Sequence, residues 1–186
     1  MMLTIGVLVL LFFIGCSKNI IPDGNSGIAA ADPKNVDNAG DVDTDWKDIE
    51  LRDVKTGETF KISDFKGKPI LLESFAVWCP TCKKQQDEVK KLHEQVGDDV
   101  VSVSLDTDPN EGEQKVIEHV NRHGYDWLYV VSPVELTKSL IDQFGTGIVQ
   151  APQAPVILVC EDQSARLLQR GVKSDSDLLS EIVKGC

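Results

Sequence analysis

Two cysteines separated by two residues are the groups in this sequence best suited to chemistry. They lie in the segment Trp78-Cys79-Pro80-Thr81-Cys82, whose sulfurs can close a small disulfide ring if the segment begins a helix. A thiolate is the nucleophile in thiol–disulfide exchange, and the unpaired N–H groups at a helix N-terminus stabilise it. Pro80 suits the first helical position, where its missing N–H costs nothing. We expect Cys79, as the more exposed cysteine, to attack and Cys82 to resolve the mixed disulfide.

Other uses of such a pair remain open: half of a zinc site, a permanent structural disulfide, or a clamp in a binding or metal-delivery module. Structural zinc takes four ligands, commonly two close cysteine pairs or cysteines with closely spaced histidines. Cys160 and Cys186 are too far apart in sequence to form a second close pair, and His93, His119 and His123 lack finger spacing. We expect no metal and no cofactor, with His119 and His123 on a solvated helix surface.

The elements around the motif are a buried strand and an amphipathic helix. The apolar run from Ile70 to Phe75 is typical of a central strand, and Val89, Leu92 and Val96 recur at helical spacing over residues 80–96. Lys83 and Lys84 would add positive charge near the thiolate. The order of elements predicts an α/β fold with a mixed central sheet and helices on both faces. The other expected elements are a β-hairpin (48–53 and 58–62), strands at 100–105, 128–131, 156–160 and 165–171, and helices at 113–123, 135–144 and 175–184.

The segment Phe75-Ala76-Val77-Trp78-Cys79-Pro80-Thr81-Cys82 resembles the active-site segment of the thioredoxin superfamily. The preceding Phe65-Lys66-Gly67-Lys68-Pro69-Ile70-Leu71-Leu72, the N-terminal hairpin and a helix–strand segment inserted after Asp106 are similar to the membrane-anchored TlpA/ResA/DsbE branch. The resemblance covers about residues 46–184. It implies a thioredoxin fold and a thiol–disulfide oxidoreductase without a cofactor.

The same resemblance implies a direction and partners. The branch suggests a reductant that receives electrons from a membrane protein and acts on disulfides of exported proteins. The Pro80-Thr81 dipeptide is the one seen in DsbE-type proteins of cytochrome c maturation, which suggests apocytochrome c as a substrate. The alternative is an oxidase that donates disulfides; a reduction potential near about −120 mV would mark the oxidase and one near about −270 mV the reductant.

Two further site residues come from the resemblance. The family places a cis-proline opposite the cysteine pair, and Pro155, which leads directly into the strand at 156–159, fits better than Pro152. Glu73 occupies the position of a buried aspartate in thioredoxin. A carboxyl group in an apolar strand has a raised pKa and could exchange a proton with Cys82; the alternative is a carboxylate at a strand edge in water. Where the branch often has an acid and a proline after the second cysteine, this chain has Gln85 and Asp87.

Cys160 and Cys186 are the remaining pair within the domain. The strand that ends at Cys160 and the last helix are each antiparallel to the strand between them, so their C-terminal ends lie near each other. A Cys160–Cys186 disulfide is therefore within reach and suits an exported protein. The alternative is a buried Cys160 beside a free thiol.

Residues 1–15 predict a signal peptide or membrane anchor. The uncharged run Leu3–Gly15 would form a helix about 20 Å long, shorter than the ~30 Å that spans a bilayer and typical of a signal peptide. Gly15 and Ser17 around Cys16 resemble the lipobox of lipoproteins, which implies a lipid on Cys16. We therefore expect the protein at the outer face of the cytoplasmic membrane.

Charge and composition indicate where the tether ends and which class of partner is excluded. Residues 17–45 contain six Asp, two Lys and no aromatic residue, so residues 16–45 predict a flexible acidic tether before a monomeric domain at 46–186. The chain has 19 Lys and Arg against 30 Asp and Glu, a net charge of −11. This balance excludes nucleic-acid binding, which requires basic surfaces.

Overall fold

The computed structural model describes residues 45–186. The expected signal peptide or anchor (1–15), the lipidation site Cys16 and the tether up to residue 44 lie outside the described residues. Within residues 45–186, no helix is both long enough and apolar enough to cross a membrane.

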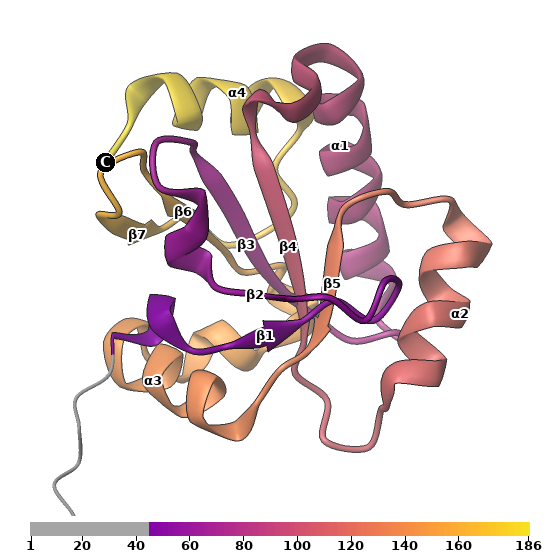
Figure 1. The fold of residues 1–186 in the computed structure, drawn as a ribbon. Helices are drawn as coiled ribbons and strands as arrows, with labels where there is room; N and C mark the ends of the chain where they lie inside the picture. The colour runs from indigo at the N-terminus through magenta and orange to yellow at the C-terminus, as the bar shows by residue number, and fades with distance from the viewer. Residues whose placement is uncertain (1–44) are drawn as a thin grey trace, which may run out of the picture. The chain divides into compact units, whose positions relative to one another are not determined.

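A mixed five-stranded sheet forms the centre of the domain (Figure 1), with the strand order β5-β4-β3-β6-β7. The three strands β3 (Ile70–Phe75), β4 (Val101–Asp106) and β5 (Leu128–Val131) are parallel. The strands β6 (Val156–Val159) and β7 (Ala165–Leu167) extend the sheet in antiparallel pairing. The predicted α/β class with a mixed sheet is confirmed, although β7 ends four residues earlier than expected.

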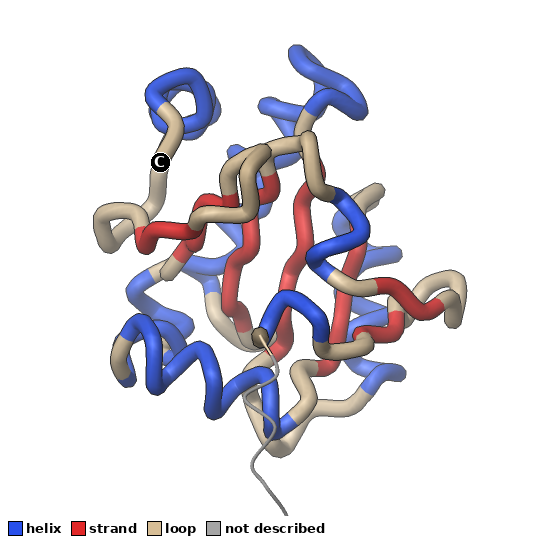
Figure 2. The backbone as a smooth tube through the Cα atoms, turned by 60° about the vertical axis from the view of Figure 1, so that its left-hand side comes forward, coloured by secondary structure: helices blue, strands red, loops and turns tan. Residues whose placement is uncertain are grey.

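Helices cover both faces of the sheet, as Figure 2 shows. One core layer packs α1, α2 and α4 against Leu71 and Phe75 of β3. The other layer packs α3 and the N-terminal hairpin against Ile70 and Leu72. The alternation follows from the two-residue period of a strand, which sends successive side chains to opposite faces. The helices are α1 (Pro80–Val96), α2 (Glu113–His123), α3 (Val134–Phe144) and α4 (Asp175–Lys184).

The expected hairpin before the central sheet is present, with shorter strands than predicted. Its strands β1 (Leu51–Arg52) and β2 (Thr59–Phe60) form a separate antiparallel sheet. Asp53 is buried; its Oδ2 accepts a hydrogen bond from the Thr56 N–H (2.9 Å) and its Oδ1 accepts one from the Tyr129 N–H (3.0 Å). One carboxylate therefore closes the hairpin turn and attaches the hairpin to β5.

Glu73 lies in the middle of the sheet. Its register partners are Ser104 on β4 and Val156 on β6. Because alternate side chains of a strand share a face, Glu73 lies on the same face as Leu71 and Phe75, the face that α1 covers. The sheet thus places one carboxyl group in the layer that also contains both cysteines of the motif.

Candidate active site

Cys79 and Cys82 lie where β3 gives way to α1. Cys79 has extended backbone angles and is the N-cap of α1, and Pro80 is the first helical residue. The N–H of Cys82 donates a hydrogen bond to Sγ of Cys79 (3.1 Å). A disulfide joins the two cysteines, whose Cα atoms are 5.3 Å apart. The sulfur of Cys79 thus receives an N–H that would otherwise have no partner, at the positive end of the helix dipole.

The disulfide is covered, and the exposed group beside it is an indole. Cys79 and Cys82 are each 2% exposed, whereas Trp78 is 60% exposed. The expectation that Cys79 is the more exposed cysteine is therefore wrong in the disulfide form. Sγ of Cys82 lies 3.1 Å from the carbonyl oxygen of Ala151, in the short helical turn Ala151–Gln153 before β6. A partner disulfide must reach the sulfurs past this cover.

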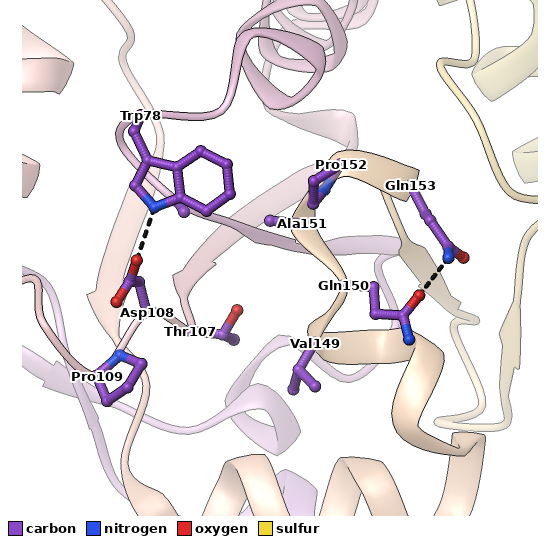
Figure 3. Close-up of a pocket in the computed structure, with 10 residues that line it drawn as sticks. Trp78, Thr107, Asp108, Pro109, Val149, Gln150, Ala151, Pro152 and Gln153 are labelled. Atoms are coloured by element: carbon purple, nitrogen blue, oxygen red, sulfur yellow. Dashed lines mark hydrogen bonds between the residues drawn. The ribbon is translucent and has the colours of Figure 1, made fainter.

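A pocket of about 420 Å³ opens beside Trp78 (Figure 3). Pro152 is exposed and lines this pocket, whereas Pro155 is buried and its carbonyl accepts the Ser74 N–H (3.2 Å). The role of Pro155 in shaping a substrate groove therefore stays a prediction, and Pro152 is the proline at the pocket. The lining residues are Ala76, Trp78, Thr107, Asp108, Pro109, Val149, Gln150, Ala151, Pro152 and Gln153.

Carboxylates from the loop between β4 and α2 fix the two residues before Cys79. Oδ2 of Asp108 accepts a hydrogen bond from Nε1 of Trp78 (2.6 Å; Figure 3). Oε2 of Glu111 accepts one from the Val77 N–H (2.7 Å). No local pattern in the sequence marks this acidic loop as part of the site. The parallel pairing of β3 and β4 brings the ends of both strands to one edge, which is the signal that could have identified it.

The last residue of β4, just before this loop, is a buried acid, Asp106, which is 1% exposed. Burial, together with the nearby Glu111 carboxylate, raises the pKa of Asp106 above its usual range. Hydrogen bonds from Trp78 and from the Asn110 N–H hold the pKa of Asp108 below its usual value. Asp108 is therefore an ionised acceptor for the Trp78 indole in the neutral pH range.

Replacing Glu111 with alanine is expected to destabilise the active-site loop. The Val77 N–H would lose its acceptor, at a cost of about 1–3 kcal/mol in the free energy of unfolding, measured by urea denaturation. Glu113→Ala is the matched control, because its carboxylate pairs with Arg52 where both side chains are 51% exposed, and such a pair contributes less than about 1 kcal/mol. Equal losses in the two variants would contradict the anchoring role of Glu111.

Glu73 is buried, at 4% exposure, which excludes the alternative of a carboxylate in water. Oγ of Ser104 donates a hydrogen bond to its Oε1 (2.5 Å), and Nε1 of Trp127 donates to Oγ of Ser104 (2.8 Å). Burial raises the pKa of Glu73 to about 7, against the opposing effects of the Ser104 hydrogen bond and the positive charge of Lys173. The carboxyl group therefore can hold or release a proton in the neutral pH range.

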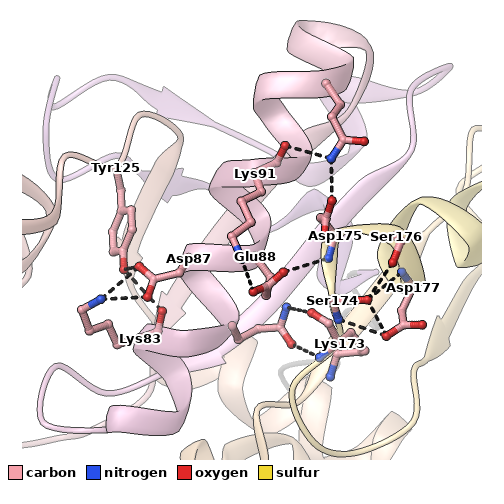
Figure 4. A network of polar contacts seen from close by, with 12 residues as sticks. Lys83, Asp87, Glu88, Lys91, Tyr125, Lys173, Ser174, Asp175, Ser176 and Asp177 are labelled. Carbon is pink, nitrogen blue, oxygen red and sulfur yellow. Dashed lines mark hydrogen bonds and ion pairs between the residues drawn. The ribbon is translucent and has the colours of Figure 1, made fainter.

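The positive charge expected from Lys83 is offset by a neighbour. Nζ of Lys83 pairs with the Asp87 carboxylate at 2.8 and 3.0 Å, and the Tyr125 hydroxyl donates to Oδ1 of Asp87 at 2.9 Å (Figure 4). At position 87, where the family often has a proline, this chain has an aspartate that forms an ion pair with Lys83. Stabilisation of a Cys79 thiolate rests on the N-terminus of α1 more than on Lys83.

Cys160 and Cys186 are joined by a second disulfide, with Cα atoms 6.0 Å apart. Cys160 follows Val159, which pairs with Ile70 at the start of β3. The motif Cys79–Cys82 follows the other end of β3. The two disulfides therefore lie at opposite ends of the β3–β6 pair.

Within residues 45–186, no group of three or more His, Cys, Asp and Glu residues is arranged to hold a metal ion. The expected surface position of His119 is wrong. His119 is buried, its Nε2 lies 2.7 Å from Oε1 of Gln86, and burial lowers its pKa to about 4. Its neighbours Val116 and Val120 are buried on the same helix, so His119 belongs to the core face of α2.

Comparison with known families matches residues 19–178 to the family described as Redoxin. This range includes every strand of the sheet and both cysteines of the motif. The chain belongs to the Redoxin family. This match, together with the ResA relatives described next, confirms the predicted membership of the thioredoxin superfamily in the TlpA/ResA/DsbE-like group.

Individual relatives of this Redoxin-family chain are distant. The thiol-disulfide oxidoreductase ResA of Oceanobacillus iheyensis is 28% identical over 78 residues, which are 40% of this chain and 41% of that protein. The chain spans less than half the length of the curated relatives it matches.

Solved structures support the thioredoxin fold. A putative electron transport protein from Aquifex aeolicus has a TM-score of 0.60 at 21% identity and covers 73% of this chain and 92% of its own. A secreted Mycobacterium tuberculosis disulfide oxidoreductase, described as homologous to Escherichia coli DsbE, has a TM-score of 0.56 at 14% identity, with 75% and 97% coverage. At these identities the likeness establishes the fold alone, and the predicted thioredoxin fold is confirmed.

Proposed function

We propose that this chain is an extracytoplasmic thiol–disulfide oxidoreductase that reduces disulfides in exported proteins. The observation that carries the proposal is the Cys79–Cys82 disulfide at the N-terminus of α1, next to an exposed Trp78 and a pocket. The relative ResA, named as a thiol-disulfide oxidoreductase, supports the reaction type. The Pro80-Thr81 dipeptide favours apocytochrome c among the substrates.

The reaction begins from the dithiol. The Cys79 thiolate attacks one sulfur of a substrate disulfide, so that a mixed disulfide forms and one substrate thiolate leaves. Cys82 then attacks Sγ of Cys79, which releases the second substrate thiol and closes the Cys79–Cys82 disulfide. Two electrons thus pass to the substrate, and a dithiol protein in the membrane returns two electrons to the pair.

Glu73 supplies a place for the proton of Cys82. The thiol of Cys82 must lose its proton before it can attack, and a carboxyl group with a pKa of about 7 accepts a proton efficiently near neutral pH. The buried Glu73 is the group we assign to this step, directly or through an intervening water. Its proton returns to the solvent or to the leaving thiolate.

An extracytoplasmic location is supported by the sequence and by the second disulfide. Leu3–Gly15 and Cys16 predict a leader with a lipidated cysteine, and residues 16–45 predict a tether. Stable disulfides such as Cys160–Cys186 belong to oxidising compartments. We therefore place the domain, as a monomer, at the outer face of the cytoplasmic membrane, with exported proteins and a membrane electron donor as partners and without nucleic acid.

The experiment that tests this function is a measurement of the reduction potential of Cys79–Cys82. The protein is equilibrated in dithiothreitol and glutathione buffers, and its thiols are counted by alkylation and mass spectrometry. We expect a potential nearer to about −270 mV than to about −120 mV. A value near about −120 mV would identify an oxidase, and a stoichiometric metal in the reduced protein would identify a metal-delivery module.

A further inference from the structure

Lys173 is a buried lysine in the segment between β7 and α4. It is 7% exposed. Its Nζ donates hydrogen bonds to the carbonyl oxygens of Ala154 (2.7 Å), Gly171 (2.6 Å) and Gln169 (3.3 Å). Lysine is rarely buried without partners, because removing an ammonium from water is costly. Three carbonyls compensate for that cost here, and they hold the ammonium group in one place.

The backbone of Lys173 is attached to the helix that carries the cysteines. Nε2 of Gln85 donates to the Lys173 carbonyl (3.2 Å), and the Lys173 N–H donates to Oε1 of Gln85 (2.8 Å; Figure 4). Gln85 is three residues after Cys82 on α1 and is itself buried. One residue therefore links α1, the segment before α4 and, through Ala154, the turn that leads into Pro155.

The turn that Lys173 holds is part of the cover over Cys82. Ala154 has a left-handed backbone conformation, with φ of 44°, which is unfavourable for a residue with a Cβ atom and needs support from its surroundings. Its N–H donates to the Ala151 carbonyl (2.8 Å), which is the same carbonyl that lies 3.1 Å from Sγ of Cys82. The Lys173 hydrogen bond thus supports the turn at the Ala154 carbonyl, three residues after the Ala151 carbonyl that faces the sulfur.

Lys173 also acts on Glu73 by its charge. Its positive charge lowers the pKa of Glu73, which burial raises to about 7. In return, Glu73 raises the pKa of Lys173, which burial lowers to about 8. Each group therefore favours the charged form of the other, without a direct ion pair between them within residues 45–186.

Within the described residues, the titratable groups around Glu73 other than Lys173 and the active-site thiols carry no charge near neutral pH. Ser104 on β4 is neutral, and burial raises the pKa of Tyr129 on β5 and of Tyr125 before it above the usual range. His119 on α2 has a pKa lowered by burial to about 4, so it is uncharged between about pH 5 and pH 7. Apart from the thiols on α1, Lys173 is the charged partner of Glu73 in this layer.

We propose that Lys173 is a positioning residue of the exchange site, which holds the turn over Cys82 through Ala154 and fixes a positive charge at Ala154, two residues before Val156, the register partner of Glu73. The first half rests on the hydrogen bonds. The second half rests on the proposed function, since the proton affinity of Glu73 matters to exchange only if Cys82 passes its proton to that carboxyl group.

The test compares Lys173→Met with Lys184→Met in the full chain. Methionine keeps most of the length of lysine and removes its charge. Lys184 is the control because its side chain is 70% exposed and lies on α4. The side-chain carboxyl carbon of Glu73 is titrated by NMR and assigned by its loss in Glu73→Gln. We expect its midpoint to rise by at least about one pH unit in Lys173→Met and to stay unchanged in Lys184→Met.

A second readout is the pH profile of insulin reduction. Lys173→Met is expected to move the rising limb of the profile to higher pH, because Glu73 then stays protonated up to a higher pH. In a Glu73→Gln background the same substitution should no longer move the profile, whereas a purely structural role would reduce the rate at every pH in both backgrounds. If Lys173→Met does not fold, Lys173→Gln, which keeps N–H donors without charge, takes its place.

An unchanged Glu73 midpoint in a folded, uncharged variant would overturn the inference. The NMR titration needs no exchange activity, so the two proposals fail separately. A shifted midpoint in a chain that reduces no disulfide would refute the proposed function and leave standing only the effect of the Lys173 charge on Glu73. Normal disulfide reduction with an unshifted Glu73 midpoint would refute the role of Lys173 and leave the proposed function standing.

Discussion

Cys79→Ser is expected to lower the rate of insulin reduction by at least about 1000-fold. A serine hydroxyl is almost entirely protonated at neutral pH and is a poor nucleophile toward a disulfide, whereas a cysteine at a helix N-terminus is readily ionised. Cys79 occupies that N-cap position and receives the Cys82 N–H at its sulfur. The loss should therefore be in the chemical step, with little change in folding.

Substitution of Cys82 tests which of the two cysteines attacks first. Cys82→Ser retains the nucleophile but cannot resolve, so it should accumulate a mixed disulfide with the substrate, visible by non-reducing electrophoresis and mass spectrometry. Cys160→Ser is the control, because its sulfur lies at the other end of the β3–β6 pair and its loss should leave the rate unchanged. Undiminished insulin reduction by Cys79→Ser would contradict the proposed function. If only Cys79→Ser accumulated a mixed disulfide with the substrate, Cys82 would be the attacking cysteine and Cys79 the resolving one.

The second large effect is on stability. Removing the Cys160–Cys186 disulfide with the double substitution Cys160→Ser and Cys186→Ser should lower the free energy of unfolding by about 3.5 kcal/mol. The bond closes a loop with a sequence separation of 26, and the chain-entropy relation gives about this value for such a loop. Urea unfolding without reductant measures it.

The other disulfide provides the matched comparison. Cys79–Cys82 closes a loop with a separation of only 3, so Cys79→Ser with Cys82→Ser should cost clearly less stability while abolishing activity. The two double variants are thus expected to separate activity from stability. Equal losses of stability would contradict the loop-length account of the second disulfide.

The sequence was informative wherever local rules decide the structure. A buried apolar run followed by Cys79 and by Pro80 predicted the strand-to-helix position of the motif, because periodicity and helix-start preferences act over a few residues. The position of Glu73 within that run likewise indicated a buried carboxyl group, as the structure has it.

Contacts between segments that are distant in the chain could not be predicted from such local rules. Glu111 and Val77 are separated by 34 residues, and Lys173 and Gln85 by 88. These pairs depend on strand order and on how a loop turns, and neither leaves a pattern in the residues nearby. His119 is different, because Val116 and Val120 at helical spacing already mark its face of α2 as buried.

Because Cys79 and Cys82 are covered, the reduction potential of the pair and the rate of its exchange are set by different features of the structure. The potential depends on the charges and hydrogen bonds at the sulfurs, whereas the rate also depends on access. At 2% exposure, small thiols that collide at random are held back, and a partner that docks at Trp78 gains an advantage. Two redox pools in one compartment can then stay out of equilibrium with each other, with this domain linking only the proteins that fit it.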